Sequence, residues 1–377
     1  MYSPDIVDNL EGMCTTDADR SLIEPRIAEL VAERAGVPDA SGALGGPAIP
    51  SACRAMLDAV VAQGMTSSEG GKRLRALLAL TAYDVFGGGP ASRPAMVDMA
   101  CAIEVFQTAA LVHDDIIDDS DLRRGRPSAH RALETWSGAP AIGRGLGLML
   151  GDLLATACVD IANSAAGGLA HSSALVSAFL TMQREVEIGQ VLDLAVEQAS
   201  LDYPQALVEA SLGVFRWKTA SYTTIAPLEL ALLAAGVDPD DARARALAVG
   251  EPLGLAFQLE DDLIDVVGSS RTSGKPVGGD IREGKRTVLL ADALDMASRD
   301  EADELAAMFR APARDEADVR RAIGLFSSTG AVAQSHDRIA RLWRRTLDAI
   351  DGLGLDARPH ERLVHACARF VPDVAER

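Results

Sequence analysis

Two clusters of aspartates have the spacing of a metal site. Each follows an apolar run and reads Asp-Asp-x-Ile-Asp, and together they comprise Asp114, Asp115, Asp118, Asp261, Asp262 and Asp265. Residues four apart share one face of a helix, about 6 Å apart along its axis, so the first and last aspartates of each cluster point the same way. Their mutual repulsion favours a bound cation, and Mg²⁺, a hard ion with oxygen ligands, is the natural candidate. One cluster alone would equally suit a solvated helix end, but two copies favour a cation site.

Basic residues indicate what such a cation would hold. The stretch Gly70–Arg75 opens a helix, and its Lys72 and Arg75 are three residues apart on one face. A helix N-terminus also attracts anions through its free N–H groups. The alternative, an ordinary basic first turn, would oppose the helix dipole. The stretch therefore favours an anion site.

Further basic residues follow the same logic. Arg123 and Arg124 come just after the first cluster, and arginine forks suit phosphate oxygens. Simple pairing with the aspartates at positions 118, 119 and 121 is the alternative. Lys218, followed by Thr219, falls inside an apolar helix, where a lysine is costly to bury unless it is paired. Lys275 lies in a glycine-rich loop after the second cluster, which alone would indicate only a mobile surface loop. Together with two acidic clusters, these residues predict diphosphate chemistry in an apolar cavity.

Composition narrows the class of protein. The 377 residues are 48% hydrophobic, and the formal net charge of -19 excludes a typical nucleic-acid binder, which would show a basic face. The five cysteines, at positions 14, 53, 101, 158 and 367, form no Cys-x-x-Cys pair and indicate a reducing compartment. The sequence shows neither a signal peptide nor an uninterrupted apolar run of about 18 residues. We therefore expect a cytoplasmic protein without a transmembrane segment.

The hydrophobic pattern is helical from Cys53 nearly to the end, without strand alternation or a short-period repeat. Glycine and proline separate the runs. The runs include Leu74–Phe86, Ala95–Asp119, Ala141–Ala166 and His171–Gln198. The pattern predicts an all-α fold with roughly ten or more helices around a central cavity, across which the two acidic helices face each other.

The predicted boundaries follow from composition and proline. We expect a polar, irregular and mobile extension at residues 1–20, a single helical domain at 21–370 and a C-terminal tail at 371–377. Pro252 should divide a long helical run, leaving Leu253–Val267 as the helix that carries the second cluster.

With these motifs in view, the sequence resembles the trans-isoprenyl diphosphate synthases, also called polyprenyl synthetases. The matching stretches are Gly70–Arg75, Glu104–Arg126, Gly151-Asp152, Lys218-Thr219, Phe257–Asp265 and Gly274–Thr287. The resemblance covers about residues 25–370. It implies the all-helical isoprenoid synthase bundle, usually as a homodimer, and the Mg²⁺-dependent condensation of isopentenyl diphosphate with an allylic diphosphate such as dimethylallyl, geranyl or farnesyl diphosphate.

The resemblance also implies roles for individual residues. Asp114 and Asp118 would bind Mg²⁺ on one side of the allylic diphosphate. Asp261, with Asp265 more loosely or through water, would bind a third ion on the other side. The remaining roles concern the substrates. The allylic diphosphate would be held by Arg123, Lys218 and Lys275, isopentenyl diphosphate by Lys72, Arg75 and Arg124, and the developing allylic cation by oxygens of Thr219 and Gln258. No Ser, Cys or His nucleophile is needed.

One position departs from the commonest family pattern. Many members have His where this chain has Gln107, as part of the isopentenyl diphosphate site. Glutamine can donate a hydrogen bond but carries no charge, so we expect a modestly weaker diphosphate grip without loss of activity.

The residues before the first cluster bear on product length. Phe106 and Ala110 share a helix face with Asp114, and Ala109 lies beside Ala110. In the family, a bulky residue just before the first motif stops the chain short, and one helical turn of about 5.4 Å is close to one isoprene unit. With alanine at both positions, Phe106 is the candidate floor. This favours geranylgeranyl diphosphate over farnesyl diphosphate, and leaves a longer product open.

Two rival functions remain at this point. A class I terpene cyclase shares the fold and the first motif, but usually has a different second motif, rich in Asn/Asp, Ser/Thr and Glu. A regulatory subunit of a heteromeric synthase generally loses acids from the motifs, whereas every motif acid is present here.

Overall fold

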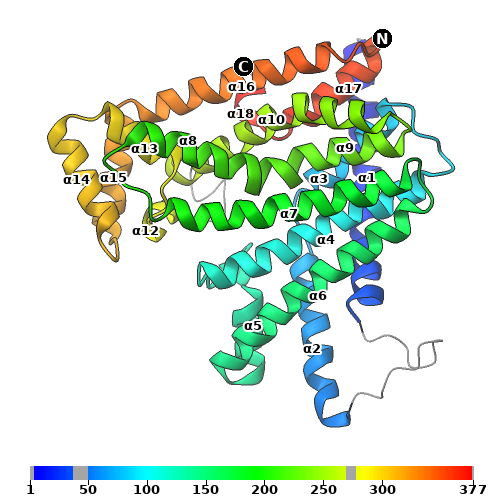
Figure 1. Ribbon diagram of the computed structural model, residues 1–377, viewed down its shortest axis with the longest axis horizontal. Coiled ribbons are helices and arrows are strands. Elements are labelled where there is room, and N and C mark those ends of the chain that lie inside the picture. The colour runs from blue at the N-terminus through cyan, green and yellow to red at the C-terminus, as the bar shows by residue number, and fades with distance from the viewer. Residues whose placement is uncertain (1–3, 37–49, 269–276, 376–377) are drawn as a thin grey trace. The chain divides into compact units, whose positions relative to one another are not determined.

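The computed structural model describes residues 4–36, 50–268 and 277–375 (Figure 1). The predicted all-α fold with more than ten helices is confirmed. The chain divides into two compact units, which are described separately below. Unit 1 comprises Met1–Leu180 and Pro227–Ala242, and unit 2 comprises Thr181–Ala226 and Arg243–Arg377. The single domain expected for residues 21–370, and the cavity between the two acidic helices, stay predictions.

Unit 1 is built around α4 (Arg93–Ile117), whose long apolar run accounts for its central place. It packs against α1, α2, α3, α5 and α6. Besides α4, unit 1 contains α1 (Pro4–Arg34), α2 (Ser51–Ser68), α3 (Leu74–Val85), α5 (Ala129–Ser137) and α6 (Pro140–Ala166). It also contains the first part of α7 (Ser172–Val196), most of α9 (Ala226–Ala234) and the start of α10 (Pro239–Val267). Figure 1 shows α4 and α6 lying alongside each other.

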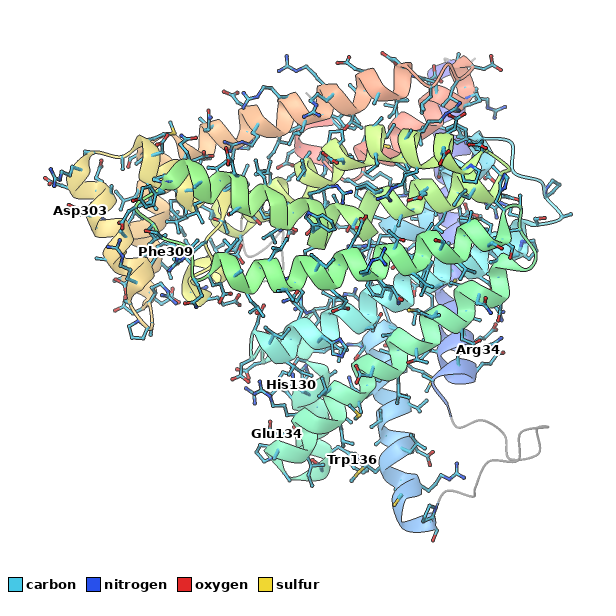
Figure 2. All side chains as sticks on the ribbon, in the orientation of Figure 1. Arg34, His130, Glu134, Trp136, Asp303 and Phe309 are labelled. Carbon is cyan, nitrogen blue, oxygen red and sulfur yellow. The ribbon has the colours of Figure 1, made fainter. Side chains whose placement is uncertain are left out.

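Glycines let α6 approach its neighbours closely. A Cβ at Gly143 would lie 2.3 Å from the backbone of Glu134, and one at Gly147 would lie 2.8 Å from the Cβ of His130. Both partners are on α5 and are labelled in Figure 2. A Cβ at Gly151 would lie 2.2 Å from the His113 ring of α4. Because α4 ends at the first aspartate cluster, this packing fixes the helix end that carries it.

Unit 2 is also helical, and α13 lies at the centre of one of its layers. All residues from Val288 to Leu294 are buried, and the helix packs against α8, α14, α15 and α16. The elements are the rest of α7 and α10, α8 (Pro204–Val214), η1 (Phe215–Ile225), α12 (Gly279–Glu283), α13 (Val288–Met296), α14 (Arg299–Arg310), α15 (Glu316–Ser328), α16 (Ala331–Asp351), α17 (Ala357–Ala368) and α18 (Pro372–Ala375). The element η1 is a π-helix, a rare form that often occurs at functional sites.

The structure corrects the expected chain ends. Residues 4–20, predicted to be irregular, belong to α1, and Asp19 in this stretch forms an ion pair of 2.8 Å with Arg93. Within the predicted tail, residues 372–375 form α18, and the backbone N–H of Asp373 donates to Glu260 at 3.0 Å. Asp19 and Asp373 are therefore held by polar contacts that a composition argument does not detect, and the expected mobility of residues 1–20 stays a prediction.

Two further differences concern proline and strands. Pro252 does not divide its run, because α10 continues through it from Pro239 to Val267. The Thr224 hydroxyl donates to the Gly250 carbonyl at 2.6 Å, which supplies a hydrogen bond near the interruption. A two-stranded hairpin, β1 (Leu122–Arg123) and β2 (Arg126–Pro127), follows α4. Strands of two residues are too short to show alternation in a sequence.

Two helices are long and apolar enough to cross a membrane, α4 and α6. The apolar window of α4 is 67% buried within the fold and that of α6 is 44% buried. Core helices of soluble proteins have the same properties, so this finding is weak evidence for a membrane span. The expected absence of a transmembrane segment stays a prediction.

Candidate active site

The first aspartate cluster occupies the last turn of α4 and the residue after it. Asp114 is half-buried, with a side chain 18% exposed, Asp115 is 2% exposed, and Asp118 is half-buried at the C-cap. Burial raises the pKa of Asp115, although the hydrogen bond and charge of Arg123 oppose this effect. The cluster therefore combines one buried acid with a more accessible pair on a shared helix face.

Arg123, on β1, turns back to this cluster. Its Nε donates to Asp115 at 2.9 Å, a second nitrogen also bonds Asp115, and Asp114 lies 3.8 Å away. Two of the aspartates expected as alternative partners of the arginine pair, Asp119 and Asp121, pair with Arg131 of α5. The chain turns just after α4, where the Ser120 N–H bonds the Asp115 carbonyl, and this turn brings Arg123 back to the helix end within a few residues.

Arg124 occupies the hairpin turn and reaches the Gly70 stretch. Its Nη1 donates to the carbonyl of Glu69 at 2.9 Å and of Gly70 at 3.4 Å. Gly71, at φ 94°, packs so closely that a Cβ there would lie 3.2 Å from this guanidinium. Partial burial and the nearby charges of Arg73, Arg123 and Arg75 lower the pKa of Arg124. Such a concentration of arginines is suited to an anion.

Arg73 shapes the turn that presents its neighbours. It is 3% exposed and pairs with Glu24 at 2.8 Å and with the buried Glu104 at 3.4 Å. Glu104 also accepts from the N–H of Ala76 at 3.1 Å, in the first turn of α3. Because Arg73 is turned inward, Lys72 beside it stays exposed.

Arg75 and Gln107 are two further residues of unit 1 that were predicted to bind isopentenyl diphosphate. Arg75 is 7% exposed and Gln107 is half-buried. A pocket of about 230 Å³ in unit 1 is lined by Arg123 and Arg124 together with Leu111 of α4. Lys72, Arg75 and Gln107 do not line it. The structure thus brings Arg123 to Asp114 and Asp115 and places Arg123 and Arg124 at one pocket, while the roles of all the predicted residues stay predictions.

The predicted chain-length residues lie in the buried part of α4. Phe106 and Ala109 are each 1% exposed, and Ala110 is half-buried. The large side chain of Phe106 is therefore inside unit 1, as a floor requires. Whether a product contacts it stays a prediction.

In unit 2, Lys218 and Thr219 lie in the π-helix η1. The Lys218 ammonium bonds Asp193 of α7 at 2.6 Å, and the Thr219 hydroxyl donates to Gln258 of α10 at 2.9 Å. Sequence reasoning required a partner for Lys218 but did not name Asp193. The sequence does contain a signal for this partner, because one predicted helix carries Glu185, Gly189 and Asp193 at intervals of four residues, on a single face.

The second aspartate cluster continues this polar chain. The amide of Gln258 donates to Oδ1 of Asp262 at 2.9 Å, which orients the Gln258 oxygen toward Thr219. Asp262 is 6% exposed, and its Oδ2 has no hydrogen-bond partner within the described part of the chain. Burial and the neighbouring charges of Asp280 and Asp261 raise its pKa well above the ordinary value.

Asp265 differs from the other motif acids because it caps another element. Its Oδ1 accepts from the N–H of Gly279 and its Oδ2 from the N–H of Asp280, each at 3.0 Å, at the start of α12. Asp280, which the sequence did not single out, has a pKa raised to about 7 by burial and by the nearby carboxylates of Asp265, Glu283 and Asp261, against the opposing charge of Lys285. Lys275 lies outside the described residues.

These carboxylates could supply some, but not all, of the ligands of a hard cation. Residues 4–36, 50–268 and 277–375 contain no group of three or more His, Cys, Asp or Glu side chains that could hold a metal alone. Mg²⁺ usually binds one or two carboxylates and completes its shell with water and substrate phosphates. Buried Asp262, next to exposed Asp261, has an oxygen without a partner among the described residues, and its raised pKa shows that its charged form is disfavoured; such an ion would favour that form.

Comparison with known proteins identifies the family. Residues 57–326 match the polyprenyl synthetase family. A geranylfarnesyl diphosphate synthase of Aeropyrum pernix is 31% identical over 300 residues, which cover 78% of this chain and 87% of that protein. A short chain isoprenyl diphosphate synthase of Methanothermobacter thermautotrophicus is 32% identical over 267 residues, covering 71% and 76%.

A solved structure is similar along nearly the whole chain. It is the geranylgeranyl pyrophosphate synthase of Corynebacterium glutamicum complexed with isoprenyl diphosphate and magnesium, with a TM-score of 0.79 and 31% identity. The match covers 94% of this chain and 98% of that one. We conclude from the acidic clusters, from the basic side chains beside them and from these matches that this chain belongs to the polyprenyl synthetase family of trans-isoprenyl diphosphate synthases and is a prenyltransferase.

Proposed function

We propose that this prenyltransferase uses Mg²⁺ to condense isopentenyl diphosphate with dimethylallyl, geranyl or farnesyl diphosphate, and that geranylgeranyl diphosphate is its main product. The observation that carries the proposal is in unit 1, where Arg123 lies beside Asp114 and Asp115 and lines the same pocket as Arg124. Carboxylates that can bind a hard cation thus lie close to guanidinium groups that can bind phosphate oxygens. The neighbour complexed with isoprenyl diphosphate and magnesium supports the same chemistry.

Different residues would bind the metal ions and the two substrates. Asp114, Asp118 and Asp261, with Asp265 through water, would hold three Mg²⁺ ions, which when bound would stabilise charge on the leaving diphosphate. Arg123 and Lys218, with Lys275, would bind the allylic diphosphate. Isopentenyl diphosphate would be bound by Lys72, Arg75, Gln107 and Arg124. Lys218 would then exchange its contact with Asp193 for one with a diphosphate oxygen.

The reaction proceeds by ionisation, condensation and elimination. The allylic C–O bond breaks, and its electron pair leaves with the diphosphate. The double bond of isopentenyl diphosphate attacks the allylic cation, and a proton is then lost to the departed diphosphate. Thr219 and Gln258 are suited to the cation because their mutual hydrogen bond, continued to Asp262, holds electron-rich oxygens in place.

Product length is proposed from α4. The buried Phe106 would end the tunnel, with Ala109 and Ala110 leaving space above it. Substituting Ala109→Phe should shorten the product, since the added ring would occupy about one turn of helix, close to one isoprene unit. An unchanged product length would contradict this placement of the tunnel. A product longer by one unit is the second candidate, because a relative is a geranylfarnesyl diphosphate synthase.

One incubation separates the proposal from the rival functions. The protein with Mg²⁺ and geranylgeranyl diphosphate alone should release no hydrocarbon, whereas a terpene cyclase would. Added isopentenyl diphosphate and a shorter primer should give prenyl diphosphate. No turnover by the purified chain, combined with activation of a second synthase, would instead support the regulatory reading.

We also propose a homodimer in the cytoplasm. In unit 1, Ile142, Leu148 and Met149 of α6 are 45%, 46% and 48% exposed, an apolar surface that a second copy would cover. Light scattering should give the mass of two chains, and a monomer at micromolar concentration would contradict it. The described cysteines are all free, which supports a reducing compartment. Cell fractionation should place the protein in the soluble fraction.

A further inference from the structure

One face of α7 follows the π-helix η1 along its length. Glu185, Gly189 and Asp193 are four residues apart, so they share this face. A Cβ at Gly189 would lie 2.2 Å from the backbone nitrogen of Lys218, and Asp193 bonds the Lys218 ammonium at 2.6 Å. The face therefore touches both the backbone and the side chain of the residue proposed to bind the allylic diphosphate.

Glu185 of α7 joins η1 to an arginine of α10. It is 8% exposed and accepts hydrogen bonds from the Ser221 hydroxyl and, at 3.3 Å, from Arg216, both of η1. Arg243 of α10 donates to its other oxygen at 2.8 Å. Burial opposes the charged form of Glu185, but these three partners lower its pKa below the ordinary value. The carboxylate is thus a charged anchor for residues on both sides of Lys218.

Glycines of α10 make room for η1 on another side. A Cβ at Gly250 would lie 2.9 Å from the Cα of Ile225, and one at Gly254 would lie 2.4 Å from the Cβ of Ala220. A π-helix bonds i to i+5, so it has more residues per turn and is wider than an α-helix. A wider helix needs small neighbours, and glycine is present on both packed sides.

We propose that Glu185 and Gly189 are positioning residues that hold η1 in its π-helical register, so that Lys218 and Thr219 are presented to the allylic diphosphate. The importance of this register for catalysis rests on the proposed function. The π-helical register itself does not rest on the proposed function, because it is a property of unit 2 without substrate. Asp193 keeps Lys218 aligned until a diphosphate oxygen replaces it.

The first experiment measures amide hydrogen exchange over residues 215–225 without substrate. Glu185→Gln removes the charge but keeps an acceptor for Ser221, and Gly189→Ala places a methyl group against the Lys218 backbone. Both should speed exchange within η1 about tenfold, since a less constrained segment opens more often. Exchange as slow as in the wild type in both variants would overturn the proposal.

Two matched controls separate positioning from general stability. Asp292 is also buried, at 6% exposed, and pairs with Arg338 at 2.5 Å within unit 2, so Asp292→Asn removes a comparable buried ion pair away from η1. Gly324 has open space at its Cβ position, so Gly324→Ala is the control for the added methyl group. Neither control should change exchange within η1. Faster exchange there in the controls too would contradict a specific role for α7.

The second experiment measures turnover with each substrate varied. Misplacing Lys218 and Thr219 should lower kcat/KM for the allylic diphosphate roughly 100-fold, because small displacements of positioning groups have effects of this size. The KM for isopentenyl diphosphate should change by less than about twofold. Equal losses for both substrates would overturn the positioning role. A wild-type chain without any turnover would overturn the proposed function, and exchange would still decide the register.

Discussion

The two aspartate clusters have nearly the same sequence but different surroundings. In the first, the buried middle acid, Asp115, is bonded to Arg123, which β1 carries back to it. In the second, the buried middle acid, Asp262, has the neutral amide of Gln258 at one oxygen and no hydrogen-bond partner at the other among the residues described. One cluster is compensated by the protein, and the other has an excess of negative charge. The motif sets the spacing of acids, and neighbouring elements set the charge.

The sharpest test of this comparison neutralises the two middle acids. Asp115→Asn would leave Arg123 with less compensation and should lower the free energy of unfolding by about 3 kcal/mol, the usual scale for breaking a buried pair. Asp262→Asn keeps the Gln258 contact and removes charge repulsion, so metal-free protein should lose nothing or gain about 1 kcal/mol. Urea denaturation without Mg²⁺ measures both. Equal losses would show that the clusters are electrostatically alike.

The acid excess in unit 2 also predicts a pH dependence. The folded pKa of Asp280 is about 7, above its ordinary value of 3.8, so between these values the folded state holds a proton that the unfolded state has released. Stability of metal-free protein should therefore fall as pH rises from about 4 to about 7, by on the order of 2 kcal/mol. Asp280→Asn should flatten this fall. The same slope in the variant would mean that another group is responsible.

The smallest expected effect concerns Asp265, the last acid of the second cluster. Asp265 caps α12 with both oxygens, so Asp265→Ala should cost about 1 kcal/mol and speed amide exchange at Gly279 and Asp280. Asp261→Ala is the control, and it should leave these two amides protected. Unchanged exchange at both amides in Asp265→Ala would show that the cap does not stabilise α12.

Helix positions were predictable because apolar periodicity and punctuation by glycine and proline are local signals. The runs predicted at 74–86 and 141–166 differ from the observed helices by a single residue at one end each. Pro252 was misread because a proline rule takes no account of tertiary contacts, and α10 continues through it with the Thr224 hydroxyl bonded to the nearby Gly250 carbonyl. Glycines of two other helices lie against the π-helix η1, and no local pattern reveals this packing.

Site residues were predictable where chemistry follows from spacing. Asp114 and Arg123 were found in this way, and the structure brings them within 3.8 Å. Asp193 was missed because its role depends on a lysine 25 residues away, on another element. Asp280 was missed because an isolated aspartate in a glycine-rich stretch has no sequence signal until α12 is placed beside α10.

The central claim is tested most directly by product analysis. Purified protein, Mg²⁺, isopentenyl diphosphate and each allylic primer would be incubated, and the products dephosphorylated and resolved by chain length. The account predicts a dominant 20-carbon alcohol, as geranylgeranyl diphosphate requires, and no product when Mg²⁺ is chelated. A longer ladder would keep the reaction and discard the Phe106 floor. No product with any primer in the presence of Mg²⁺ would contradict the proposed condensation itself.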